Sequence, residues 1–171
     1  RKKTSKRECI MKSKKINFLM IITIIAILLD QLIKIIIKSK IFNSSIILIP
    51  HVLNLTYVQN TGAAFGIGSN STSMFVAVNV VIIGLITYFI FSKKEELSKL
   101  ILIALHLVLA GGIGNLIDRI ARGFVIDYID ISPLIKYPVF NLADIFVVIG
   151  CLIIAAFLVK DIVIKKKNIG E

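Results

Sequence analysis

Cysteine, histidine and tryptophan are scarce in this sequence. It has no tryptophan, two cysteines and two histidines among 171 residues. Cys9 lies in a basic arm and Cys151 in an apolar run, so there is no CxxC motif and no disulfide framework. His51 and His106 stand alone, without a second ligand at a metal-site spacing. The sequence therefore predicts no bound metal and no cofactor.

Acidic residues are also few. Ten acidic residues stand against 21 basic ones, which gives a net charge of +11. Eight of the 21 basic residues lie in the first fifteen positions, and three more form the run 165–167. A protein that binds nucleic acid can carry such a charge, but it does not combine it with long apolar runs. No nucleic-acid partner is predicted.

Apolar residues are what the sequence has in excess. They make up 57% of the chain, against about 45–50% in a soluble domain. A bilayer core needs about 20 consecutive, mostly apolar residues in a helix. Four stretches meet this requirement, and the sequence therefore predicts an all-α membrane protein with four transmembrane helices. The predicted spans are 16–37, 73–91, 98–118 and 141–160.

The first apolar run is too long for the hydrophobic region of a signal peptide, and no small-residue cleavage pattern follows it. We expect it to remain as a spanning helix. Residues 1–10 precede Met11 and are interpreted as an extension without a functional role. The expected organisation is a basic arm at 1–15, one membrane domain at 16–160 and a basic tail at 161–171.

Lysine-rich segments predict the orientation. The link 92–99 carries Lys93, Lys94 and Lys99, and it lies on the same side as both termini if there are four spans. The positive-inside rule places that side in the cytoplasm. The loops 38–72 and 119–140 then face outward. Alternation around "LNLTYVQ" in the first of these loops predicts a strand, and we expect a small extracytoplasmic β-sheet lying on the membrane.

Ionisable residues inside spans are costly and point to function. Asp30 and Lys34 are four residues apart in the first span, so they can pair on one helix face. We interpret them as a structural ion pair, with Lys34 and Lys38 extending toward the membrane interface.

"GGIGNLIDR" closes the third span. Asn115, Asp118 and Arg119 are spaced to share a helix face, and the three glycines let another backbone or a substrate approach closely. Helix packing with an interfacial Asp118–Arg119 cap is the alternative. For Asn115 and Arg119 we prefer a binding site.

"FNLAD" opens the fourth span, and "VIDYID" precedes it. Asn141 and Asp144 are three apart, and a helix cap with an acid in the first turn would also explain them. Asp127 and Asp130 could each be solvated loop acids. Five acids lie outside the predicted cytoplasmic segments, and four of them fall within 27 residues at one membrane face. That clustering favours a site.

"NTGAAFGIG", residues 60–68, has a polar start and a run of small residues. It is either a flexible turn or a segment whose backbone contacts a ligand.

Paired carboxylates are the chemistry that remains. Two close aspartates share one proton. The ionised one activates a water, while the protonated one polarises a carbonyl and then protonates the leaving nitrogen. Such a pair hydrolyses an amide without a metal or a covalent intermediate. The chemistry alone leaves open whether Asp127 or Asp118 is the partner of Asp144.

Five blocks resemble, in order and spacing, those of bacterial lipoprotein signal peptidase, also called signal peptidase II. The resemblance covers nearly all of 16–160. The blocks are "DQLIK" (30–34), "NTGAAFG" (60–66), "GGIGNLIDR" (111–119), "VIDYID" (125–130) and "FNLAD" (140–144).

This resemblance implies a metal-free aspartyl endopeptidase of the bacterial cytoplasmic membrane. The family removes signal peptides from prolipoproteins by cutting before a cysteine that carries a diacylglyceryl group. It implies Asp127 and Asp144 as the catalytic pair at the extracytoplasmic face, with Asp30 and Lys34 structural and Asp118 supporting Arg119. We expect a monomer in contact with membrane lipid and with a small β-cradle. The implied substrate-binding residues are Asn60, Gly62, Asn115, Arg119 and Asn141.

Departures from the family pattern are few. Ile33 stands where a small polar residue is common, His106 stands where an apolar residue is usual, and the loop between Asp127 and Asp144 is slightly short.

Two other functions would distribute the acidic residues differently. A transporter or channel subunit with a proton path would place carboxylates at several depths of the bilayer. A protease that cuts within the bilayer would place them at span centres. Here only Asp30 lies inside a span, and the other outward acids gather at one face.

Overall fold

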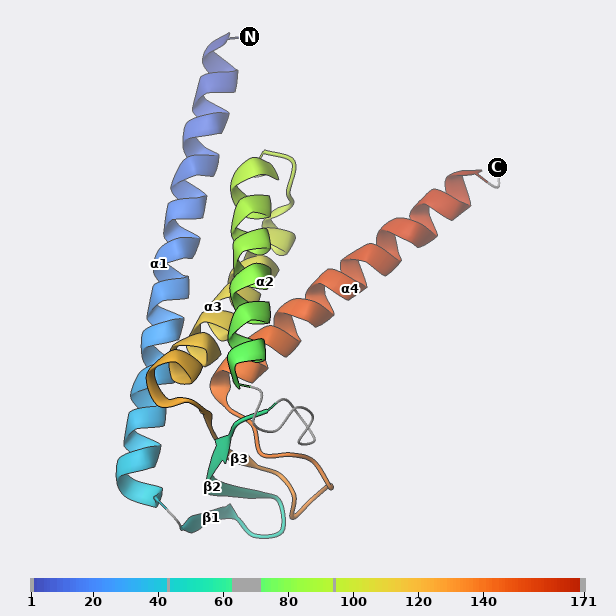
Figure 1. Ribbon diagram of the computed structural model, residues 1–171. Helices are drawn as coiled ribbons and strands as arrows, with labels where there is room; N and C mark the ends of the chain where they lie inside the picture. The colour runs from blue at the N-terminus through green and yellow to red at the C-terminus, as the bar shows by residue number, and fades with distance from the viewer. Residues whose placement is uncertain (1, 43, 63–71, 94, 170–171) are drawn as a thin grey trace.

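The structure, a computed structural model, describes residues 2–42, 44–62, 72–93 and 95–169, with side chains described from residue 18 to residue 167 within these ranges. Four helices stand together, and a small sheet lies at one end of them (Figure 1). In chain order the elements are α1 (Lys2–Ile41), β1 (Ser45–Ile49), β2 (Leu53–Asn60), α2 (Thr72–Lys93), α3 (Lys99–Arg122), β3 (Val125–Asp130) and α4 (Leu142–Ile169).

The prediction of four spanning helices is confirmed. Each helix contains a stretch long and apolar enough to cross a membrane, and these stretches are Phe18–Ile41, Thr72–Lys93, Lys99–Arg122 and Leu142–Lys167. The first and last stretches run several residues beyond the predicted ends at 37 and 160. The predicted spans end where the first lysines interrupt the apolar run. Lysine is a good helix former, so the helices continue past these lysines.

Helix α3 is the centre of the bundle, because it packs against α1, α2 and α4. It is the most buried of the four helices, whereas α2 and α4 expose most of their apolar side chains. That distribution is expected in a bilayer, where lipid chains cover the outward faces of the helices.

Glycines allow α4 to approach α3 closely. A Cβ added at Gly150 of α4 would lie 2.6 Å from the carbonyl oxygen of Ala104 and 2.6 Å from Cγ2 of Val108. At Gly111 of α3, an added Cβ would collide with the carbonyl oxygen of Ala143. Small residues at such contacts are what holds helices together in a membrane, where the hydrophobic effect between helices is absent.

Three antiparallel strands form the sheet in the order β1–β2–β3. The strand predicted around "LNLTYVQ" is confirmed as β2. The strand β3 was missed, because "VIDYID" was interpreted as part of a loop. It pairs with β2 so that Val125 lies opposite Asn60 and Asp127 lies opposite Val58.

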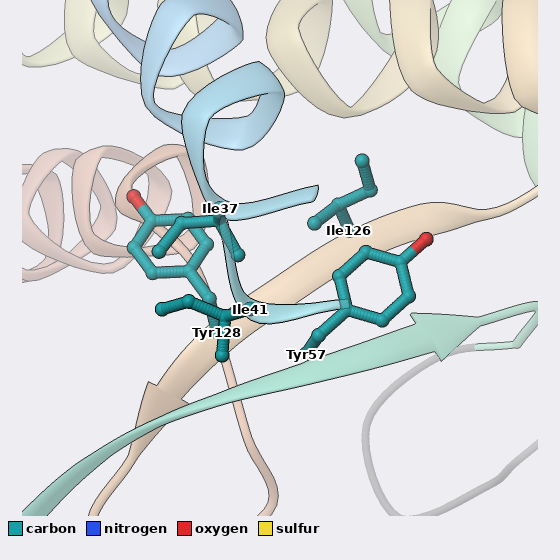
Figure 2. Packing of buried hydrophobic residues seen from close by; sticks show 5 residues of the cluster. All are labelled: Ile37, Ile41, Tyr57, Ile126 and Tyr128. Atoms are coloured by element: carbon teal, nitrogen blue, oxygen red, sulfur yellow. The ribbon is translucent and has the colours of Figure 1, made fainter. Parts of the chain in front are cut away.

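A buried cluster fastens this sheet to the end of α1. Ile37 and Ile41 of α1 pack with Tyr57 of β2 and with Ile126 and Tyr128 of β3 (Figure 2). Successive side chains on a strand point to opposite faces. Because Ile126 and Tyr128 face α1, the side chain between them on the strand, that of Asp127, is directed to the other face.

Both termini and the α2–α3 link lie at the end of the molecule opposite to the sheet (Figure 1). This arrangement matches an even number of spans. Of the lysines on which the predicted orientation rests, Lys94 lies outside the described residues.

Replacing Gly150 with alanine is expected to lower the free energy of unfolding by about 1–3 kcal/mol, because the new methyl group overpacks the α3–α4 contact. Gly84→Ala is the matched control, since nothing lies within 4 Å of a Cβ at Gly84 in α2. Thermal unfolding in detergent measures both. Equal unfolding temperatures for the two variants would contradict close packing at Gly150.

Candidate active site

The site is built around the first turn of α4. The backbone N–H of Asp144 donates to Oδ1 of Asn141 at 3.0 Å, and the backbone N–H of Asn141 donates to Oδ2 of Asp144 at 3.0 Å. This reciprocal pair is a capping box. The helix-cap interpretation of these two residues is therefore confirmed, and it leaves the Asn141 amide nitrogen and the other Asp144 oxygen for further contacts.

Two other elements satisfy the remaining free N–H groups of this turn. The N–H of Leu142 donates to the hydroxyl oxygen of Tyr128 at 3.3 Å, and the N–H of Ala143 donates to Oδ1 of Asp30 at 3.1 Å. The first N–H groups of a helix have no partner within it. Here β3 and α1 supply those partners and thereby fix the position of Asp144.

Asp127 and Asp144 are joined through asparagines. Nδ2 of Asn141 donates to Oδ1 of Asp127 at 2.6 Å, and Nδ2 of Asn60 donates to Oδ2 of Asp127 at 2.8 Å. Nδ2 of Asn115 donates to Oδ1 of Asp144 at 2.7 Å. Asn141 thus contacts both carboxylates, one through its side chain and one through its backbone.

Both carboxylates line one cavity of about 380 Å³. Asn60, Asn79, Asn115 and Arg119 contribute further polar side chains to its lining. The other walls are mostly apolar and come from α2, from the segment before α4 and from α4 itself; they include Phe75, Val139, Phe140 and Val147. The cavity thus places two acids at the edge of an apolar surface.

Burial changes the titration of Asp127, whose exposed fraction is 2%. Desolvation and, secondarily, the charge of Asp144 raise the pKa of the Asp127 carboxyl to about 7, although hydrogen bonds from Asn60 and Asn141 oppose the shift. Below about pH 7 the Asp127 carboxyl therefore carries a proton.

A buried group of charges supports the site from α1. Nζ of Lys34 lies 2.8 Å from Oδ2 of Asp30 and 3.0 Å from Oδ2 of Asp118. The Asp30–Lys34 pair is confirmed, but the prediction that Lys34 extends to the interface is wrong, because its side chain is fully buried. Lys34 also donates to Oδ1 of Asn115 at 3.0 Å. This contact turns the amide nitrogen of Asn115 toward Asp144.

No hydrogen bond or ion pair joins Asp118 to Arg119 in the described part of the chain, so the predicted support of Arg119 by Asp118 has no direct contact there. Asp118 pairs with Arg122, and its Oδ2 accepts from the N–H of Ile126 at 3.2 Å. Asp118 is fully buried and does not line the cavity. Of the two candidates left open by the sequence, the structure brings Asp127, and not Asp118, together with Asp144.

Arg119 faces the cavity. Its Nη2 donates to the carbonyl oxygen of Gly62 at 3.1 Å, and its guanidinium lies 5.4 Å from the ring centroid of Phe75. Its Nε is buried and has no hydrogen-bond partner within the part of the chain that the structure describes. Gly62 donates its N–H to Oδ1 of Asn60 at 3.0 Å. It thereby links Arg119 to Asn60, which is a hydrogen-bond partner of Asp127. The small residues 63–68 of the predicted motif lie outside the described residues.

Sequence reasoning missed Gln31, Arg122 and Tyr128. Nε2 of Gln31 donates to the carbonyl oxygen of Gly114 at 3.0 Å and to Oδ1 of Asp118 at 3.1 Å, while Oε1 of Gln31 accepts from Arg122. A glutamine beside Asp30 inside an apolar run was a usable signal. Arg122 gave none, because it follows the predicted end of the span.

Comparison with known proteins identifies the family. The sequence profile of signal peptidase (SPase) II matches residues 22–160, most of the chain. The chain belongs to the signal peptidase II family. Two relatives named lipoprotein signal peptidase, from Halothermothrix orenii and Caldicellulosiruptor bescii, are 42% and 38% identical over 139 and 141 residues. These alignments cover 81% and 82% of this chain, and 92% and 90% of the relatives.

A third relative of that name, from Staphylococcus aureus, is 36% identical over 150 residues, which is 86% of this chain and 91% of the relative. The fold is also similar to that of a bacterial membrane enzyme solved by the in meso method at 2.3 Å, with a TM-score of 0.78 and 36% identity over 85% of this chain and 89% of that one. The chain is therefore a multi-pass membrane protein of an aspartic protease family.

Replacing Lys34 with methionine is expected to destabilise the protein by about 3–5 kcal/mol, because it leaves Asp30 and Asp118 buried without their shared cation. Lys38→Met, one turn later on the exposed side of α1, is the matched control. Thermal unfolding of both variants in detergent is the measurement. An unfolding temperature of Lys34→Met equal to that of the control would show that the cluster does not stabilise the fold.

Proposed function

We propose that the cavity is the active site, where Asp127 and Asp144 remove signal peptides from prolipoproteins whose cysteine carries a diacylglyceryl group. The observation that carries this proposal is the shared contact of Asn141, which holds both carboxylates at the wall of one cavity. No other pair of acids lines that cavity among the described residues.

In the proposed reaction, Asp144 is the general base. Its two oxygens accept hydrogen bonds from Nδ2 of Asn115 and from the backbone N–H of Asn141, which hold this carboxylate at the cavity wall. Asp144 takes a proton from a water, whose oxygen attacks the carbonyl carbon before the lipidated cysteine. Asp127, whose pKa is raised to about 7, donates its proton to the carbonyl oxygen. When the C–N bond breaks, Asp144 gives its proton to the leaving nitrogen. Asp127 takes back a proton from one hydroxyl of the tetrahedral intermediate, so that a carboxylic acid forms and both aspartates return to their starting states. No bond to the protein forms.

The polar residues around the pair would bind and orient the substrate. Asn60, Asn115 and Asn141 hold the carboxylates by hydrogen bonds, and Gly62 anchors Arg119. Positioning of this kind supplies much of an enzyme's rate enhancement.

We further propose that both termini lie in the cytoplasm and that the cavity opens at the outer face of the bacterial cytoplasmic membrane. The ends of α2 and α4 that lie away from the sheet (Figure 1) belong to segments rich in lysine. The positive-inside rule assigns that end of the molecule to the cytoplasm. The proposed unit is a monomer in contact with membrane lipid, with one membrane domain at 16–160 between a basic arm and a basic tail, and without a nucleic-acid partner.

Asp127→Asn and Asp144→Asn are each expected to lower cleavage of a lipidated precursor by about 10²–10⁴-fold, because each removes one half of the acid–base pair. A gel shift of the precursor measures cleavage. Asp130→Asn is the matched control on the same strand and should cleave normally, since Asp130 contacts Thr56 and Ser132 and not the cavity. Normal cleavage by either active-site variant would remove that residue from the pair. The same precursor without its diacylglyceryl group should remain uncut.

Cleavage is expected to fall as the pH rises through about 7. Asp127 has a raised pKa, so it carries the needed proton below about pH 7 and loses it above. Initial rates at saturating precursor from about pH 5 to about pH 9 test this. In the control variant Asp130→Asn, the fall of the cleavage rate with rising pH should occur at the same pH as in the unaltered enzyme. For that residue, burial raises the pKa, but hydrogen bonds from Ser132 and Thr56 outweigh it and leave the pKa below its usual value. A rate that climbs steadily above pH 7 would contradict the role of Asp127.

A further inference from the structure

Asn79 is a polar residue in an unexpected place. It lies inside the span of α2, is half-buried and lines the cavity that holds Asp127 and Asp144. Its amide has no hydrogen-bond partner among the described residues. An amide in a membrane helix is costly unless it finds a partner. Neither the fold nor the proposed chemistry explains this side chain.

The depth of Asn79 follows from the antiparallel contact of α2 with α3. Oγ1 of Thr72, at the start of α2, donates to the carbonyl oxygen of Gly123 at 3.0 Å, just after the end of α3. Further in, Phe75 lies against the guanidinium of Arg119. Asn79 is one helical turn deeper than Phe75, and Asn115 is one turn deeper than Arg119. Asn79 therefore lies level with Asn115, the residue that donates to Asp144.

The substrate of a signal peptidase brings unpaired backbone groups to this depth. A signal peptide crosses the bilayer as an apolar helix, and its last turn leaves up to four carbonyls without intrahelical donors. At the edge of the hydrocarbon region such carbonyls are stabilised when the protein supplies hydrogen-bond donors. The cavity offers the buried Nε of Arg119, which has no partner among the described residues. It also offers the amide of Asn79, for which no hydrogen bond is found among those residues. Phe75, one turn before Asn79 on α2, lies against the guanidinium of Arg119 and offers an apolar surface to the cavity.

We propose that Asn79 binds the peptide backbone of the signal peptide where its helix ends, ahead of the bond that is cut. A peptide backbone has both a donor and an acceptor, which together match an amide side chain, whereas the ester groups of a lipid offer acceptors alone. This inference rests on the proposed function, because it takes the cavity as the place of cleavage. Asn79 is a substrate-binding residue and takes no part in proton transfer.

Asn79→Leu tests the inference. The variant is expected to raise KM for the lipidated precursor by about 3- to 10-fold and to change kcat by less than about twofold, because the lost hydrogen bond is made equally in the bound and transition states. Asn79→Gln keeps an amide and should recover part of the affinity. Ser73→Leu, an exposed polar residue of α2 outside the cavity, is the matched control and should change neither constant. The unfolding temperature of Asn79→Leu should not fall, because leucine is favourable in a membrane-spanning helix.

A backbone substitution in the precursor identifies the atom that is bound. Precursors with one backbone ester among the last helical positions of the signal peptide should show a raised KM at one position with the unaltered enzyme. Asn79→Leu should show no further rise at that position, because the contact is already lost.

An unchanged KM for Asn79→Leu overturns the inference. The inference is also overturned if the rise in KM of Asn79→Leu depends on the diacylglyceryl group and not on the peptide. Replacing the esters of that group by ethers would then abolish the difference between the variant and the unaltered enzyme. These outcomes are separate from a failure of the proposed function, in which the unaltered enzyme would not cut the lipidated precursor or Asp127→Asn would cut it normally.

Discussion

The first turn of α4 presents backbone N–H groups that no carbonyl within the helix can satisfy, and the site depends on how they are satisfied. Asn141 takes one of them, Tyr128 of β3 takes another and Asp30 of α1 takes a third. Each partner comes from a different part of the fold. Because an unpaired N–H in a membrane is costly, this turn has one favourable position, and Asp144 is held where Asp127 and Asn141 meet it.

Behind this turn lies a set of buried charges that balance one another. Lys34 and Arg122 face Asp30 and Asp118, two cations against two anions. Buried charges are tolerated when they are paired and hydrogen-bonded. These charges also orient Asn115. Lys34 donates to the side-chain oxygen of Asn115, so the amide nitrogen of Asn115 is directed toward Asp144. The fold thereby keeps the paired acids Asp30 and Asp118 behind the site, while Asp127, whose pKa is raised, and Asp144 line the cavity.

The cavity combines two environments that suit a substrate held in a membrane. Its polar end holds the carboxylates, while its walls offer valine and phenylalanine side chains. Asn79 and Arg119 bring unpaired donors to the boundary between the two. A helix that enters from the bilayer would meet apolar walls first and donors where its own hydrogen bonding ends.

Much of this protein was determined by its sequence alone, because hydropathy and helical periodicity are local properties. The four spans, the strand β2, the pairing of Asp30 with Lys34 and the gathering of acids at one face all follow from spacing along the chain. Tertiary structure alone decided which residues face each other. Spacing gives the face on which Lys34, Asp118 and Asn79 lie, but not the element that covers that face. Strand β3 forms because β2 and the end of α1 bury its alternate residues, and that contact turns Asp127 toward Asn141.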